Sequence, residues 1–147
     1  MVCVGEIVNT HGIKGELRIV SDFKYKDKVF INGNKLYLGK RKQKVVITSY
    51  RKHKNYDMVK FEGIDDINDA IIFKGDDVFV KRESLDIDGY VDEDIIGLKV
   101  YDEDKLIGKV TSIIKNKQEI LLVKNRNKSY LIPFVDEFIK NIDLDKK

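Results

Sequence analysis

The fold of this chain is decided by fifteen residues near its start, Val4-Gly5-Glu6-Ile7-Val8-Asn9-Thr10-His11-Gly12-Ile13-Lys14-Gly15-Glu16-Leu17-Arg18. An apolar run over Val2–Val8 leads in and an alternating run over Glu16–Ser21 leads out, so both flanks are predicted strands. Gly12 and Gly15 permit positive φ and a close approach of other backbone. The stretch therefore predicts two paired strands joined by a shaped turn. That turn presents three polar side chains, those of His11, Lys14 and Glu16.

Further strands are predicted through the rest of the front half. Asn32-Gly33-Asn34 lies between Val29–Ile31 and Lys35–Leu38. Asn-Gly is a strong hairpin signal because both central positions of the favoured turn need positive φ. A second hairpin is predicted from the runs 45–51 and 56–62, in which alternation places Asp57, Val59 and Phe61 on one face.

One short helix is predicted to interrupt these strands. Asp65 or Asp66 can cap it, because a carboxylate accepts from free backbone N–H groups. Apolar residues follow at helical spacing and Gly75 is placed to end the helix; the apolar positions are Ile64, Ile67, Ala70 and Ile71. A last strand follows over Asp77–Arg82. Six or seven short strands and one helix within residues 1–82 predict a small β-barrel.

The remainder of the chain is predicted to be a linker and a second β-rich unit. Residues 83–93 are acidic and weakly periodic, which is typical of a linker. Residues 94–147 contain four predicted strands, at 98–101, 105–114, 119–124 and 129–132. Pro133 ends the last strand because it cannot donate to a ladder, and a short helical closure is predicted from Phe134 to Leu144. The fold class is thus mainly β, with two small barrels and one or two short helices.

Charge is distributed unevenly between the two halves. Residues 1–82 carry 17 Lys and Arg against 11 Asp and Glu, whereas residues 83–147 carry 11 against 14. A basic front half can face phosphate. Four lysines lie at predicted turns, where they can reach phosphates without disturbing a core: Lys42, Lys44, Lys52 and Lys54. Ordinary solubilising charge explains them equally well, and Tyr50 and Tyr56 can either stack on bases or pack between strands.

The sequence predicts no catalytic site, no metal and no cofactor. It contains no G-x-S-x-G, phosphate loop or G-x-G-x-x-G, and Cys3, His11 and His53 lack metal-ligand spacing. A general-base role for His11 needs a nucleophile that no motif supplies, so bonding within the turn and a binding contact are the other interpretations. No apolar run reaches the roughly 18 residues of a membrane span. A lone cysteine suits a reducing compartment, so we expect a cytoplasmic protein without a membrane partner.

Four blocks of sequence, taken together, resemble the ribosome maturation factor RimM family. The first is the opening stretch, and the others follow in order at 61–70, at 94–100 with 107–110, and at 131–135. The resemblance implies a non-enzymatic assembly factor with an N-terminal six-stranded barrel, of the kind seen in translation factors, and a C-terminal PRC-barrel. It also implies binding to the immature small (30S) ribosomal subunit, with assistance to maturation of its head and to 16S rRNA processing.

The resemblance further suggests partners and contact residues. The protein partner it implies is the head ribosomal protein numbered nineteen in the small subunit, and we expect the chain itself to be a monomer. Gly12, Gly15 and Glu16 match the turn motif by position. Candidate rRNA contacts are His11 and Lys14, together with the four turn lysines. Candidate contacts to the ribosomal protein are Tyr90, Asp94 and Gly97, with Val91 standing where the family commonly has a second tyrosine. The alternative function is a general RNA-binding β-barrel protein of translation whose second barrel is structural.

Overall fold

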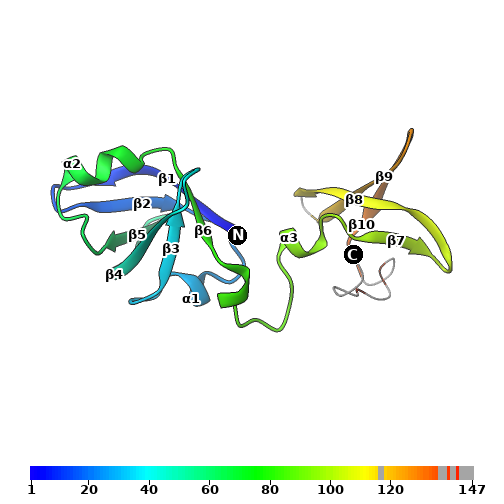
Figure 1. Cartoon of the computed structure of the whole chain (residues 1–147), viewed down its shortest axis with the longest axis horizontal. Coiled ribbons are helices and arrows are strands. Elements are labelled where there is room, and N and C mark those ends of the chain that lie inside the picture. The colour runs from blue at the N-terminus through cyan, green and yellow to red at the C-terminus, as the bar shows by residue number, and fades with distance from the viewer. Residues whose placement is uncertain (116–117, 136–138, 140–141, 143–147) are drawn as a thin grey trace. The chain divides into compact units, whose positions relative to one another are not determined.

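The chain folds into two compact units, Met1–Ile87 and Asp88–Lys147. The structure is a computed structural model that describes residues 1–115, 118–135, 139 and 142. Figure 1 labels the elements of both units. Within the described part of the chain, no helix is long and apolar enough to cross a membrane.

Six antiparallel strands close the first unit into a barrel. They are β1 (Val2–His11), β2 (Glu16–Val20), β3 (Lys35–Leu38), β4 (Gln43–His53), β5 (Tyr56–Phe61) and β6 (Asp77–Val80). Around the barrel the order is β1-β2-β5-β4-β3-β6, and β6 pairs with β1. The predicted six-stranded barrel is therefore confirmed. Closure pairs every strand on both sides and leaves no free sheet edge.

Alternate side chains of these strands fill the barrel. Leu17 and Ile19 of β2 face Val59 of β5 inside it, and all three are wholly buried. The register of β1 and β4 shifts at bulges, among them one at Ile47/Ser49. Bulges bend a strand and increase its twist, which a small barrel needs in order to close.

The hairpin predicted around Asn32-Gly33 is wrong. Val29 ends a short helix, α1 (Lys26–Val29), and an irregular segment then leads to β3. Val29 and Phe30 are buried, and this burial outweighs the local preference for a hairpin. The Asn34 side chain donates to the carbonyl of Val29 at 2.7 Å, which ties the segment back to α1.

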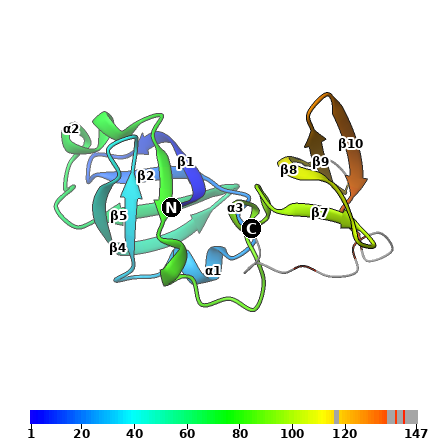
Figure 2. The same cartoon turned by 45° about the vertical axis from the view of Figure 1, so that its right-hand side comes forward.

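The helix predicted after Asp66 is confirmed. It is α2 (Ile67–Ala70), and the Asp66 carboxylate accepts from the N–H groups of the second and third helical residues at 2.7 and 3.1 Å. A 3-10 turn, η1 (Ile71–Phe73), continues it. The predicted apolar stripe is only partly buried, since Ile67 and Ile71 are exposed. In both views α1 and α2 lie at opposite ends of the barrel (Figures 1 and 2).

A carboxylate lies inside the barrel at the α1 end. Asp57 shares a face with Val59 and Phe61, as alternation predicts, and its side chain is 0% exposed. The Lys26 ammonium lies 2.9 Å from one carboxylate oxygen, and the Tyr50 hydroxyl donates to the other at 2.6 Å. The Tyr50 ring stacks on Phe30. Burial, together with the bond to Asp57, raises the pKa of Tyr50 to about 12.

The second unit is built on a four-stranded antiparallel sheet. Its strands are β7 (Lys99–Asp102), β8 (Lys105–Lys115), β9 (Glu119–Asn125) and β10 (Lys128–Pro133), in the order β10-β9-β8-β7 (Figure 2). Each predicted strand is present, with its ends shifted by no more than one residue. The helical closure predicted from Phe134 to Leu144 lies largely outside the described residues.

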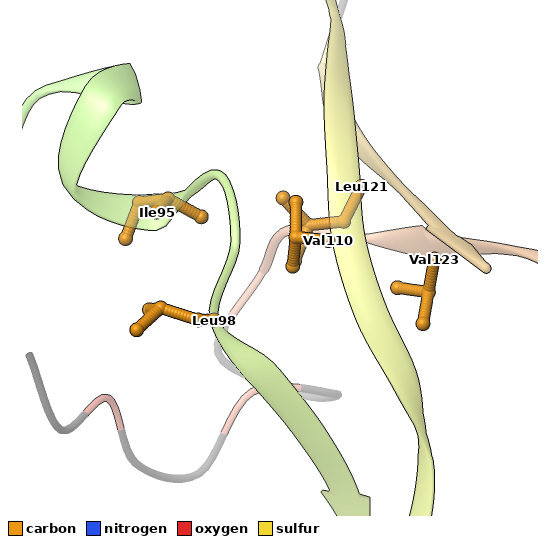
Figure 3. Close-up of a cluster of buried hydrophobic side chains, with 5 residues drawn as sticks. All are labelled: Ile95, Leu98, Val110, Leu121 and Val123. Atoms are coloured by element: carbon orange, nitrogen blue, oxygen red, sulfur yellow. The ribbon is translucent and has the colours of Figure 1, made fainter. Parts of the chain in front are cut away.

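Both ends of the segment predicted as a linker are helical. A 3-10 turn, η2 (Arg82–Ser84), begins it and α3 (Asp92–Ile95) ends it. Ile95 and Leu98 pack against the apolar face of the sheet, on a cluster completed by Val110, Leu121 and Val123 (Figure 3). A sheet with one apolar face needs such a cover, so α3 belongs to the core of the second unit.

Replacing Lys26 with methionine should destabilise the protein by about 3 kcal/mol, because Asp57 would be left buried with one fewer partner. Lys26 is 26% exposed, so the lower end of the range for buried ion pairs applies. Chemical denaturation of the full chain measures the loss. Lys28→Met on the same helix is the matched control, since Lys28 is exposed. Equal stability of the two variants would contradict the prediction.

Candidate functional site

An open groove lies beside the turn that joins β1 to β2, and we call it the barrel groove. Its volume is about 350 Å3. Seven residues line it: His11, Gly12, Ile13, Lys14, Glu16, Ser49 and Lys60. The stretch that decides the fold thus supplies five of the seven, and β4 and β5 supply the other two.

Two glycines set the path of this turn. Gly12 has φ +70° and Gly15 has φ +89°. A Cβ at Gly12 would meet nothing within 4 Å, whereas a Cβ at Gly15 would overlap the carbonyl oxygen of Ile64. The turn packs on the segment before α2, and the N–H of Ile67 donates to the carbonyl of Ile13 at 3.1 Å. The Ile13 side chain points outward and is 76% exposed.

Glu16 is held by a two-bond ion pair on the outer wall of the barrel. Arg51 donates from Nη2 and Nε to its two carboxylate oxygens, at 2.8 and 2.9 Å. These hydrogen bonds lower the pKa of the Glu16 carboxyl and raise the pKa of the Arg51 guanidinium. Glu16 therefore pairs within the fold.

His11 is braced by a neighbouring arginine. Nη2 of Arg18 lies 2.8 Å from Nδ1 of His11, and a guanidinium can only donate, so the imidazole nitrogen accepts. The His53 ring is centred 5.9 Å from the His11 ring, and Arg18 also lies over the ring of Tyr56. This arrangement occupies the Nδ1 lone pair, which favours a bracing or binding role for His11 over that of a general base.

The four turn lysines fall into two separate groups. Lys42 and Lys44 lie at the start of β4 and Lys52 and Lys54 at its end, so about 25 Å of extended strand separates the groups. Lys44, Lys52 and Lys54 are exposed. The Lys42 ammonium instead lies 3.9 Å from the centre of the Phe79 ring. Lys42 is therefore already engaged in a cation–π contact.

Three basic residues beside the groove were not among the sequence-derived candidates. They are Arg18, Arg51 and Lys60. β2, β5 and β4 lie side by side in the barrel and bring the three residues together. This strand order could not be predicted from the sequence. The alternation of β2 is the one signal that could have found Arg18, because it places Arg18 on the same face as Glu16.

The three candidates in the second unit all help to fix α3. The half-buried Tyr90 ring is centred 5.4 Å from the Phe134 ring and packs on the apolar cluster. The Asp94 carboxylate accepts from the N–H of Val91 at 3.1 Å, which satisfies a donor at the helix start. Gly97 follows the helix with φ +94°, and its N–H donates to a carbonyl of β8 at 2.8 Å.

The barrel groove presents side chains that can contact another molecule. Within the described ranges, no group of three or more His, Cys, Asp or Glu side chains is placed to hold a metal ion. The lining provides the exposed Lys14, the exposed Ile13 and the imidazole of His11. Positive charge, an apolar side chain and a ring in one open groove suit contact with a macromolecular surface.

Alanine at Gly15 should cost far more stability than alanine at Gly12. Both positions carry the penalty of a left-handed backbone, about 1 kcal/mol. Gly15→Ala must also displace the Ile64 backbone, so its total cost should be about 3 kcal/mol. Denaturant midpoints of the two variants test this. Equal costs would show that the turn does not depend on its close packing before α2.

The ion pair of Glu16 should make stability depend on pH in a defined direction. Because the fold lowers the pKa of Glu16 below 4.5, the ionised carboxylate stabilises the protein above that pH. The contribution is lost as the pH falls through the folded pKa. Wild type should therefore be more stable than Glu16→Gln at pH 7, and the difference should shrink as the pH falls from 4.5 toward the lowered pKa of Glu16. Glu62→Gln, at an exposed position, is the control, and a difference that grew on acidification would contradict the assignment.

Two family models match the chain in sequence order. The RimM N-terminal domain matches residues 2–85 and the RimM PRC barrel domain matches residues 92–147. Together they cover nearly all of both compact units.

Curated relatives match the chain over nearly its whole length. A ribosome maturation factor RimM of Staphylococcus haemolyticus is 39% identical over 151 residues, which covers 98% of this chain and 90% of the relative. One of Staphylococcus epidermidis is 38% identical with the same coverage. One of Shouchella clausii is 35% identical over 154 residues, covering 98% of this chain and 89% of the relative.

A solved structure shares the fold. It is a crystal structure of a 16S ribosomal RNA processing protein RimM from Pseudomonas aeruginosa, with a TM-score of 0.52 and 23% identity, covering 98% of this chain and 92% of that one. On the evidence of the two family models and the relatives, the chain belongs to the RimM family of ribosome maturation factors.

Proposed function

We propose that this protein binds the immature small ribosomal subunit and assists the maturation of its head and the processing of 16S rRNA. The observation that carries the proposal is the match to both RimM domains in order, with relatives named ribosome maturation factor at 35–39% identity. The name of the Pseudomonas aeruginosa protein specifies 16S ribosomal RNA processing. We further propose that the chain acts as a monomer in the cytoplasm and is not itself an enzyme.

The first unit supplies surfaces suited to RNA. Lys14 in the barrel groove and Lys44, Lys52 and Lys54 at the turns are exposed, and lysines in such positions contribute salt-dependent affinity for phosphate. His11 lines the same groove as Lys14. We assign the rRNA contact to these residues, with Lys42 in a minor role because of its contact with Phe79.

We assign the second unit a contact with the head ribosomal protein numbered nineteen. The segment around α3, which carries Tyr90, Asp94 and Gly97, is the proposed contact. Its support in the structure is the half-exposed Tyr90, a residue type enriched at interface centres, together with the exposed Ile96 in the same segment.

Co-sedimentation of the purified full chain with immature and mature small subunits tests the proposal. We expect retention on immature particles, and direct binding to the isolated head protein in a separate titration. Absence of the chain from immature particles would refute the function. Binding to particles without binding to the head protein would favour the alternative, a general RNA-binding barrel protein with a structural second unit.

The turn lysines should contribute unequally to particle binding, with Lys42 contributing least. Lys52→Ala with Lys54→Ala should lower the slope of log K against log salt by about 0.7 to 0.9 for each lysine that contacts phosphate. Lys42→Ala should change the slope less, because its ammonium already lies over the Phe79 ring. Titrations at several salt concentrations measure both. Binding to the isolated head protein is the control and should be unchanged; equal loss of both interactions would contradict separate faces.

A further inference from the structure

Three lysines stand side by side on the sheet of the second unit. The register pairs Lys99 of β7 with Lys109 of β8, and Lys109 with Lys124 of β9. Directly opposed residues lie about 5 Å apart across neighbouring strands and point to the same face. All three side chains are exposed. We call Lys99, Lys109 and Lys124 the lysine row.

The lysine row lies on the face of the sheet opposite to the apolar core. Val110 and Val123 adjoin Lys109 and Lys124 in the chain and are buried in the core, so alternation turns the lysines the other way. Tyr101 and Leu106 form the second pair beyond Lys99 and Lys109 along β7 and β8, and they are 54% and 46% exposed. An exposed aromatic ring therefore stands beside the row.

The lysine row should lower the stability of the sheet. Like charges that oppose one another on adjacent strands destabilise a sheet. Among the residues that the structure describes, the ion pairs involve other cations and none of these three. Lys115, on the same strand as Lys109, instead pairs with Asp92 and Glu119 at 2.9 and 3.0 Å.

Charge is also segregated along this part of the chain. Between Lys105 and Tyr130 there are seven Lys and Arg and one acidic residue, Glu119. The other acidic residues include those of α3 and of the β7–β8 turn, Asp102-Glu103-Asp104. Surfaces that serve solubility alone mix both signs. The lysine row thus lies in a stretch rich in positive charge, within a half of the chain whose net charge is negative.

We propose that the lysine row binds the phosphate backbone of ribosomal RNA. This inference rests on the proposed function, and it gives an RNA contact to the unit that otherwise has only a protein contact. Phosphates placed over the row would relieve the repulsion between the lysines and release counterions. Tyr101 offers a face on which an unpaired base can stack.

The test compares three forms of the full chain on immature small subunits over a series of salt concentrations. One carries Lys99→Gln, Lys109→Gln and Lys124→Gln. The charge-matched control carries Lys28→Gln, Lys35→Gln and Lys74→Gln, all at exposed positions. The row variant should lower the salt slope by about 2, at about 0.7 per lysine, and bind on the order of 100-fold more weakly at 0.1 M salt. The control should bind like wild type.

Stability should change in the opposite direction from binding. Lys109 has a like charge on each side, so Lys109→Gln should raise the melting temperature while it weakens particle binding. A variant that lost binding by misfolding would melt earlier. If wild type binds and the row variant keeps both its affinity and its slope, the inference is overturned and the proposed function stands. If wild type fails to bind, the proposed function itself is lost.

A photo-crosslinker on Lys109→Cys, in a Cys3→Ser background, identifies what the row touches. On immature subunits, crosslinks to 16S rRNA are expected. Crosslinks only to a ribosomal protein, or none from a bound chain, would overturn the assignment to RNA.

Discussion

The carboxylate of Asp57 lies inside the first barrel, where an ammonium and a hydroxyl from distant parts of the sequence bond to its two oxygens. Lys26 comes from α1 and Tyr50 from β4, so one buried anion joins the helix that closes the barrel end to two neighbouring strands. A buried charge tolerates few arrangements of its partners. The Tyr50 ring is also fixed against Phe30, and the segment 26–34 is thereby held to the barrel instead of pairing with itself. Apolar burial supplies most of the driving force for folding, and this contact adds stability to the arrangement in which Lys26 and Tyr50 both reach Asp57.

The pattern of strands was readable from the sequence because alternation and turn residues act locally. All four strands of the second unit and a cap of α2 by Asp65 or Asp66 followed from such signals, and the structure has Asp66 as the cap. The structure around Val29 could not be predicted in this way. Its local signal favours a hairpin, but Val29 and Phe30 are buried at one end of a barrel that distant strands build. For the same reason α3 looked like part of a linker. Its sequence is acidic and short, and only the sheet that it covers makes it a core element.

The turn motif predicted a turn that presents polar side chains, and Gly12, Lys14 and Glu16 of that motif line the barrel groove. The roles within it needed the structure. Arg51 reaches Glu16 across 35 residues of sequence, and Arg18 reaches His11 through the pairing of β1 with β2. The exposure of these side chains could not be predicted from the sequence either. Lys42 and Lys44 have similar sequence neighbours, but of the two only Lys42 places its ammonium over the Phe79 ring. The net charge of residues 83–147 also gave no sign of the lysine row. Net charge sums all residues of a segment, whereas alternation along the strands places the lysines together on one face of the sheet.

The close packing of Gly15 against the Ile64 backbone also limits where family members can gain or lose residues. Surface loops usually accept inserted residues at little cost, because loop-closure entropy grows slowly with length. The β1–β2 turn is not such a loop, since its inner side touches backbone and the carbonyl of Ile13 receives the N–H of Ile67. An added residue would lift Ile13 off that donor. Natural insertions should therefore gather in turns such as Asn125–Lys128, while the length of the β1–β2 turn stays constant.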